Sequence, residues 1–396
     1  MKLDAPPQVD LPIPDSDARE HSERLCALIR DEIDACAGRI SFQRYMQLVL
    51  YAPGLGYYAA GARKFGPEGD FVTAPEISAL FSRCVARQVE QILKRINSRT
   101  VLEVGAGRGV MAAQVLAELA ARDVVLDDYL ILETSADLQA RQSELLRAEG
   151  HEKETNISWL TDFPSGEFEG VVLANEVLDA MPVARFIAGE PVREQFVTFD
   201  DDGFRWLADE PETAGLLARV ADIETQIGMP LAHGYTSEVG LLQRGWIVEI
   251  LERLRRGVVL LFDYGYPCHE YYHPERTRGT LTCYYRHRHH EDAFHLPGLQ
   301  DLTAHVDFSA IAQAAGQVGA DVAGYTTQAN FLLSSGVLEM LEGLDPESPA
   351  YLALAGQLKK LMLPGEMGDM FKAMAISKNC TDGLLGFSAR DFRSLL

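Results

Sequence analysis

Residues 100–116 read TVLEVGAGRGVMAAQVL, the pattern of a strand, a glycine turn and a helix. An apolar run typical of a strand stops at Gly105, Gly107 and Gly109, and a helical pattern follows. Glycine at a strand-to-helix turn lets a ligand approach the backbone and face the first amides of the helix. The stretch therefore predicts a small-molecule site. Because turns and close helix–strand packing also select glycine, the pattern alone does not name the ligand.

Spacing and charge narrow the choice of ligand. Dinucleotide sites read G-x-G-x-x-G, whereas this loop reads G-x-G-x-G with Glu103 two residues ahead of it. A carboxylate there repels a pyrophosphate but attracts an ammonium, such as that of S-adenosylmethionine. Glu133 ends the next predicted strand, YLILE, where an acid can accept hydrogen bonds from both ribose hydroxyls. We therefore predict an S-adenosyl-L-methionine site, with a solvated acid as the plain alternative for Glu133.

Short apolar runs alternate with helical segments between residues 99 and 182, as in YLILETS, ISWLTD and GVVLANEVLDAMP. This alternation is typical of right-handed βαβ units, so we expect an α/β fold with a parallel sheet. Asp162 follows the third predicted strand. It is a candidate for the adenine amino group and, equally, a plain turn residue.

The chain of 396 residues exceeds one ordinary core, so we expect a main domain with additions. Residues 1–20 are predicted as a disordered arm, 21–97 as a helical lid segment and 98–396 as the core. Insertions rich in β-strands are expected near 184–240 and 266–301. Thr73 and Glu76 have capping-box spacing around Pro75 and start a predicted helix that runs to residue 96. This helix start either serves structure alone or forms part of a lid over the cofactor, so Thr73 and Pro75 are candidate cofactor-binding residues.

Composition excludes several classes of function. The net charge of −22 repels nucleic acid and anionic membrane surfaces, and no apolar run reaches the roughly 20 residues of a membrane span. Six scattered cysteines and a start unlike a leader peptide favour the bacterial cytoplasm. A histidine-rich segment at 285–295 is interleaved with arginines, which disfavours a metal, so we expect no metal and a substrate-facing loop.

Polar residues follow the fourth predicted strand, where this kind of sheet places its ligands. Asn175, Glu176 and Asp179 either cap a helix and face solvent, or line the pocket for the methyl acceptor as catalytic residues. A guanidinium acceptor suits the second reading, because a carboxylate that pairs with two of its nitrogens localises the charge there and leaves the third nucleophilic. The segment lacks the N-P-P-Y sequence of methyltransferases that act on adenine or glutamine amides.

The chain resembles the MidA-like family, which includes a mitochondrial complex I assembly factor described as a protein arginine methyltransferase. The blocks that carry the resemblance are GYYAAGARKFGPEGDFVTAPEIS, VLEVGAGRG, ILETSADLQARQ, ANEVLDAMPV, LLFDYG, RGTLTCYYRH, DLTAHVDF and EMGDMFKAM. The resemblance implies a class I, Rossmann-like fold with a mostly parallel seven-stranded sheet. It also implies S-adenosyl-L-methionine as cofactor and a protein substrate, such as a subunit of respiratory complex I. Family positions are occupied here by Gly69, Asp70, Thr73, Pro75, Glu76, Gly105, Gly107, Gly109, Glu133, Asn175, Glu176, Asp179 and Pro182.

Three functions agree with these observations. The first is a protein arginine N-methyltransferase linked to complex I assembly. The second is a methyltransferase for a small molecule, and the third is an assembly chaperone that binds S-adenosylmethionine without turnover. The sequence leaves the substrate protein, the degree of methylation and the oligomeric state open.

Overall fold

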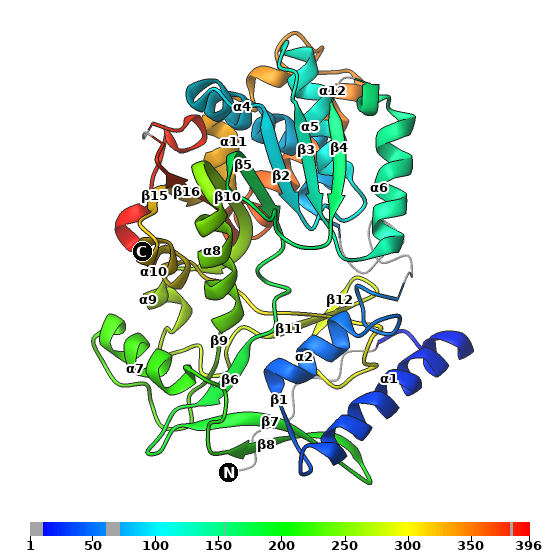
Figure 1. Cartoon of the computed structure of the whole chain (residues 1–396), viewed down its shortest axis with the longest axis vertical. Helices are drawn as coiled ribbons and strands as arrows, with labels where there is room; N and C mark the ends of the chain where they lie inside the picture. The colour runs from blue at the N-terminus through cyan, green and yellow to red at the C-terminus, as the bar shows by residue number, and fades with distance from the viewer. Residues whose placement is uncertain (1–10, 61–71, 154, 381–382) are drawn as a thin grey trace. The chain divides into compact units, whose positions relative to one another are not determined.

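A computed structural model describes residues 11–60, 72–153, 155–380 and 383–396. The internal contacts of the chain divide it into two compact units. Unit 1 consists of Met1–Phe71, Leu178–Gln243 and Cys268–Val306, and unit 2 of Val72–Val177, Arg244–Pro267 and Asp307–Leu396. Both units are built from several stretches of chain (Figure 1).

The central sheet belongs to unit 2, and seven of its strands run in the order β15-β16-β10-β5-β2-β3-β4. The ladders from β4 to β10 are parallel, whereas β16 is antiparallel to both β10 and β15. An eighth, two-residue strand, β14, pairs with β10. This arrangement confirms the expected class I fold with a mostly parallel seven-stranded sheet. The strands are β2 (Thr100–Val104), β3 (Asp128–Leu132), β4 (Asn156–Leu160), β5 (Phe168–Asn175), β10 (Leu254–Tyr266), β14 (Val306–Asp307), β15 (Asp321–Thr327) and β16 (Phe371–Lys378).

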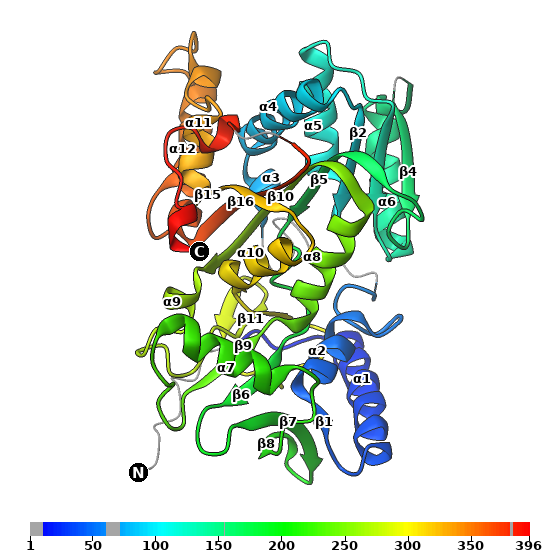
Figure 2. The ribbon, with the colours of Figure 1, turned by 60° about the vertical axis from the view of Figure 1, so that its left-hand side comes forward.

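Helices cover both faces of this sheet, as α/β crossovers require. Figure 2 shows α4 and α5 on one side of it and α8 and α10 on the other. Apolar side chains of β2, β5 and β10 pack with α4 and α5 in one continuous core. The helices are α3 (Ala74–Ile77), α4 (Ala79–Ile96), α5 (Val110–Ala121), α6 (Ala136–Ala148), α8 (Leu241–Arg253), α10 (Phe308–Gln317), α11 (Gln328–Ser334), α12 (Pro349–Met362) and α13 (Met367–Met370). Single 3-10 turns occur at His151–Lys153, Glu339–Leu341, Leu385–Phe387 and Arg393–Leu395.

Unit 1 contains two smaller sheets. The hairpin strands that the alternating pattern between 184 and 207 predicts are present as β6, β7 and β8, which pair antiparallel. The predicted loop or subdomain after residue 266 contains a three-stranded sheet in the order β12-β11-β13. The elements are α1 (Ser16–Ala35), β1 (Ile40–Ser41), α2 (Phe42–Tyr51), β6 (Ala184–Ile187), β7 (Arg193–Asp200), β8 (Gly203–Asp209), α7 (Leu216–Ile227), β9 (Thr236–Val239), α9 (Cys268–Tyr271), β11 (Thr282–Tyr285), β12 (Arg288–His290) and β13 (Asp301–Thr303).

Two helix boundaries differ from those predicted. The arm expected over 1–20 overlaps α1, which begins at Ser16 because the Asp15 carboxylate accepts a hydrogen bond from the Ala18 amide at 2.8 Å. Residues 1–10 lie outside the described residues. The helix expected over 75–96 is two helices, because Ser78 has extended backbone and its hydroxyl caps α4 by accepting from the Leu80 amide at 3.3 Å.

The last strand of the sheet, β16, is one that the sequence pattern does not indicate. It follows β15 in the chain but inserts between β15 and β10. Six consecutive positions of β16 are buried, as a strand covered on both faces requires. Helix α8 ends at Arg253, and β10 begins at the next residue, Leu254.

The six cysteines are free thiols. Within the ranges that the structure describes, no helix is long and apolar enough to cross a membrane.

Candidate active site

The glycine loop joins β2 to α5 at the carboxyl end of the sheet, and its three glycines have different roles. All three have positive φ angles, of +63° at Gly105, +55° at Gly107 and +83° at Gly109. A Cβ atom on Gly105 would lie 3.2 Å from the Val177 side chain, and one on Gly109 would lie 3.3 Å from Gln142 Cα. A Cβ on Gly107 would meet nothing within 4 Å. Packing therefore accounts for the first and third glycines, whereas Gly107 borders open space that a ligand can fill.

Glu103 lies inside unit 2, at the end of β2. Its side chain is 1% exposed, and its Oε2 accepts a hydrogen bond from the hydroxyl of Tyr129 on β3. Burial raises the pKa of Glu103 to about 7, although the Tyr129 hydrogen bond lowers it. A positively charged ligand group nearby would favour the ionised form, so the chemistry of this acid fits the predicted ammonium partner.

Glu133 directly follows β3, beside the glycine loop. A backbone hydrogen bond links the loop to the end of β3, because the Gly105 amide donates to the Leu132 carbonyl at 3.0 Å. Glu133 Oε1 accepts from the Ser135 amide at 2.9 Å, and Oε2 accepts from Gln142 Nε2 at 3.3 Å. Burial raises the pKa of Glu133. Since a carboxylate offers about four acceptor positions, Glu133 keeps capacity for ribose hydroxyls.

Sequence reasoning missed Gln142, which lies on α6 and is fully buried. Its Nε2 donates to the Gly107 carbonyl at 2.8 Å as well as to Glu133, and its Oε1 accepts from Trp159 Nε1 at 2.8 Å. The available signal was its spacing: it lies four residues from both Leu138 and Leu146, so a polar residue occupies the buried stripe of a helix.

The start of α3 lies against the glycine loop and α5. The predicted capping box is present, and the Glu76 carboxylate accepts from the Thr73 amide at 3.5 Å. The Pro75 carbonyl accepts from Gln114 of α5 at 3.3 Å, and Arg108 of the loop lies 3.7 Å from Glu76 Oε1. Thr73 and Pro75 therefore border the region of the predicted cofactor site, and their contact with the cofactor stays a prediction. Gly69 and Asp70 lie outside the described residues.

Asp162 is exposed beyond the end of β4. Its Oδ1 accepts from the amide of the next residue, Phe163, at 2.8 Å. Its role at the adenine stays a prediction.

Asn175 and Glu176 follow the buried part of β5, next to β2 in the sheet. Glu176 has a φ of +53°, which is unusual for a residue with a side chain, and its amide donates to the Phe262 carbonyl at 2.8 Å. Asn175 Nδ2 donates to Glu176 Oε1 at 3.1 Å. Asn175 Oδ1 is buried and has no hydrogen-bond partner among the residues that the structure describes. Because Val177 packs on Gly105, this strand end is joined to the glycine loop.

Asp179, the third predicted catalytic residue, belongs to unit 1 and is 5% exposed. Its segment is held by backbone contacts: the Asp179 carbonyl accepts from the Ala304 amide at 3.0 Å, and the Ala180 carbonyl accepts from the Tyr51 hydroxyl at 2.9 Å. Tyr58 stacks on Tyr51, and its hydroxyl donates to Asp301 at 3.0 Å. These contacts account for both tyrosines by packing within unit 1.

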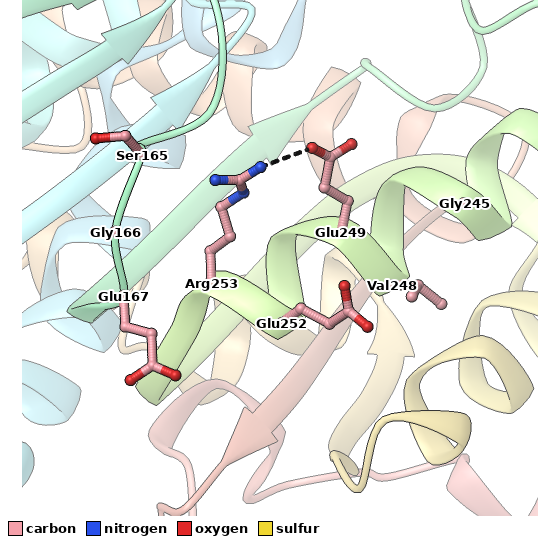
Figure 3. A pocket seen from close by; sticks show the side chains of 8 residues that line it. All are labelled: Ser165, Gly166, Glu167, Gly245, Val248, Glu249, Glu252 and Arg253. Carbon is pink, nitrogen blue, oxygen red and sulfur yellow. Dashed lines mark hydrogen bonds and ion pairs between the residues drawn. The ribbon is translucent and has the colours of Figure 1, made fainter.

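A hollow of about 640 Å³ lies on unit 2, away from the glycine loop. It is lined by residues 165–167, which precede β5, and by α8. Glutamates surround it, and Glu249 pairs with Arg253 at 3.2 Å (Figure 3). Residues 165–167 precede the first residue of β5, so the hollow lies at the amino ends of the parallel strands. The predicted ligand site lies at their carboxyl ends.

The histidine-rich segment forms the β11–β12 hairpin and the turns that follow it. In the described part of the chain, no group of three or more His, Cys, Asp or Glu side chains could hold a metal ion.

Residues 84–326 match the model of a family of putative S-adenosyl-L-methionine-dependent methyltransferases. The chain belongs to this family. A solved structure from Burkholderia thailandensis with bound S-adenosyl-homocysteine is 44% identical to this chain and has a TM-score of 0.91. The match covers 98% of this chain and 100% of the chain in that structure. A native structure from the same organism is 43% identical, with a TM-score of 0.89.

Relatives named mitochondrial protein arginine methyltransferase NDUFAF7 are more distant. The human protein is 29% identical over 86% of this chain and 80% of its own length. The homolog from Caenorhabditis elegans is 26% identical over 94% of this chain and 92% of its own length. These findings confirm the resemblance to the MidA-like family.

This chain is an S-adenosyl-L-methionine-dependent methyltransferase, and the residues at the carboxyl edge of its sheet fit that cofactor. Gly107 leaves space for a ligand beside the backbone, and Glu133 is a buried carboxylate with acceptor capacity. Glu103 is a buried acid with a raised pKa, whose ionised form a cationic group would favour.

Proposed function

We propose that the enzyme methylates the arginine side chain of a protein, and that Glu176 and Asn175 act on the acceptor. The observation that carries the proposal is the end of β5: Glu176 has a left-handed backbone, and Asn175 points a buried, unsatisfied Oδ1 beside it. A left-handed conformation costs roughly 1–2 kcal/mol for a residue with a Cβ atom. Strain of this kind is concentrated at functional sites.

The chemistry required of these side chains is modest. S-adenosylmethionine supplies an electrophilic methyl group on a sulfonium. An acceptor guanidinium has to be aligned, and one of its nitrogens has to lose a proton. As the new N–C bond forms, the bond between sulfur and the methyl carbon breaks, and S-adenosyl-homocysteine leaves with the electron pair. We propose that the Glu176 carboxylate pairs with the guanidinium and takes up this proton. An N–H of the acceptor would satisfy Asn175 Oδ1, whose lack of a partner otherwise costs stability.

The names of the relatives support a protein acceptor, since the human and nematode proteins are both called protein arginine methyltransferases. A subunit of respiratory complex I is the substrate we propose, by analogy with the assembly role that the family resemblance implies. We also propose that the enzyme acts in the bacterial cytoplasm, because its six cysteines are free thiols, as is usual in a reducing compartment.

The experiment compares three versions of a deletion strain. They carry the gene for the wild-type protein, for Glu176→Gln or for Glu167→Gln. Glu167 is an exposed acid at the opposite edge of the sheet and serves as the matched control. Quantitative mass spectrometry of tryptic peptides should find a methylarginine that is present with wild type and Glu167→Gln and absent with Glu176→Gln. The purified Glu176→Gln protein should bind S-adenosyl-homocysteine as tightly as wild type.

Other outcomes separate the alternatives. Methylated metabolites without any methylated protein would replace the proposal with a small-molecule methyltransferase. If Glu176→Gln restores complex I in the deletion strain and no methyl transfer is found, the protein acts as a chaperone.

A further inference from the structure

We propose that Gln142 is a positioning residue for the cofactor, which holds the Gly107 carbonyl and the Glu133 carboxylate in one fixed arrangement. One amide nitrogen donates to both groups, at 2.8 Å to Gly107 O and at 3.3 Å to Glu133 Oε2. Gly107 is the loop glycine that borders open space, and Glu133 is the predicted ribose acceptor. The two protein groups expected to meet the nucleoside are therefore joined through a single side chain.

Trp159 on β4 determines which way the amide points. An indole N–H can only donate, so the atom that faces Trp159 Nε1 at 2.8 Å has to be the amide oxygen. Nε2 then faces Gly107 and Glu133, where both partners are acceptors. A reversed amide would place oxygen against oxygen on that side and nitrogen against N–H on the other. The contact with Trp159 thus orients Gln142 so that its Nε2 donates to the Glu133 carboxylate.

A purely structural role explains this residue poorly. Gln142 is fully buried and stands in line with Leu138 and Leu146, so a leucine there would continue the apolar stripe of α6. Burying an amide instead is costly unless its hydrogen bonds are made. The partners of Gln142 are a glycine-loop carbonyl, the predicted ribose acid and a tryptophan of the neighbouring strand, and they surround the expected nucleoside position.

The inference rests on the predicted role of Glu133 and concerns cofactor binding only. It is independent of the acceptor, because binding of S-adenosyl-homocysteine needs no acceptor. A failed binding test would therefore leave the arginine proposal standing, and loss of the arginine proposal would leave this inference standing.

The test measures the Kd of S-adenosyl-homocysteine by isothermal titration calorimetry, together with the thermal unfolding of the ligand-free protein. Gln142→Leu should weaken binding roughly ten- to one-hundred-fold, because a hydrogen bond to a charged group is lost and the loop carbonyl is released. The matched control is Glu144→Gln, because Glu144 is exposed on the same helix. Its Kd should stay within about two-fold of wild type.

Trp159→Phe provides a second variant that keeps Gln142 in place. Without the indole N–H, Gln142 Oε1 loses its donor and the amide is held on one side only, so binding should weaken roughly three- to ten-fold. Trp246→Phe is its control, because Trp246 is a partly buried tryptophan of α8 that packs near Phe163. This pair tests the inference even if Gln142→Leu fails to fold.

A double-mutant cycle with Glu133→Gln distinguishes positioning from general stability. If Gln142 acts largely through the carboxylate, Gln142→Leu should weaken binding much less in the Glu133→Gln background than in wild type. Equal effects in the two backgrounds would overturn the inference. It would also be overturned if Gln142→Leu and Trp159→Phe lowered the unfolding temperature but left the Kd unchanged.

Discussion

Replacement of Glu133 by Gln tests the cofactor site with little change in side-chain shape. The carboxylate lies beside the glycine loop and accepts hydrogen bonds from the Ser135 amide and from Gln142. If it also accepts from two ribose hydroxyls, Glu133→Gln turns one of these charge-assisted hydrogen bonds into an unfavourable contact. A hydrogen bond to a charged group contributes about 1.5–3 kcal/mol. The Kd for S-adenosyl-homocysteine should therefore rise roughly ten- to one-hundred-and-fifty-fold.

The same substitution should not destabilise the ligand-free protein at slightly alkaline pH. Burial raises the pKa of Glu133 in the folded state. A group with a raised folded pKa contributes stability below its unfolded pKa, and this contribution is lost as pH rises through the folded pKa. Because Gln cannot ionise, the unfolding temperature of Glu133→Gln relative to wild type should increase as pH rises through that window.

Calorimetric titration and thermal unfolding measure both effects. Glu144→Gln is the matched control, because Glu144 is exposed on the same helix, α6. An unchanged Kd for Glu133→Gln, with Glu144→Gln also unchanged, would refute the assignment of the ribose acid.

Three further predictions follow from the same region. Gly107→Ala should abolish most cofactor binding, because the φ of +55° strains an alanine and its Cβ fills the open space beside the loop. Gly109→Ala should mainly lower the unfolding temperature, because its Cβ would press on α6. Calorimetric titration measures the first effect and thermal unfolding the second. Glu103→Gln should stabilise the ligand-free protein increasingly as pH rises through about 7, the raised pKa of Glu103, and a pH series of unfolding curves checks the sign. Glu176→Gly should relieve the left-handed backbone and stabilise the protein by about 1 kcal/mol while methyl transfer is lost, as chemical denaturation and a methylation assay would show.

The sequence predicted those parts of the fold that depend on local pattern. The strand, glycine turn and helix around Gly105 form as expected, and Thr73 and Glu76 form the predicted capping box. These features depend on neighbours within a few residues, so they can be predicted from the sequence alone. The number of strands in the sheet came from the family resemblance rather than from pattern, and the order of the strands was not predicted.

Features that depend on distant partners were missed. β16 is read as a strand only once its neighbours β10 and β15 are known, because a strand buried on both faces has no alternation of its own. Gln142 contacts Gly107, Glu133 and Trp159, which stand on three other segments. A glutamine in an apolar helical stripe indicates a buried hydrogen bond, but the stripe does not name the partner.

A crystal structure of this chain with S-adenosyl-homocysteine tests the cofactor and acceptor assignments most directly. Both ribose hydroxyls should donate to Glu133, the ligand should pass Gly107, and its sulfur should face the Asn175–Glu176 end of β5. A ligand bound with its ribose away from Glu133, or a sulfur remote from Glu176, would contradict these assignments.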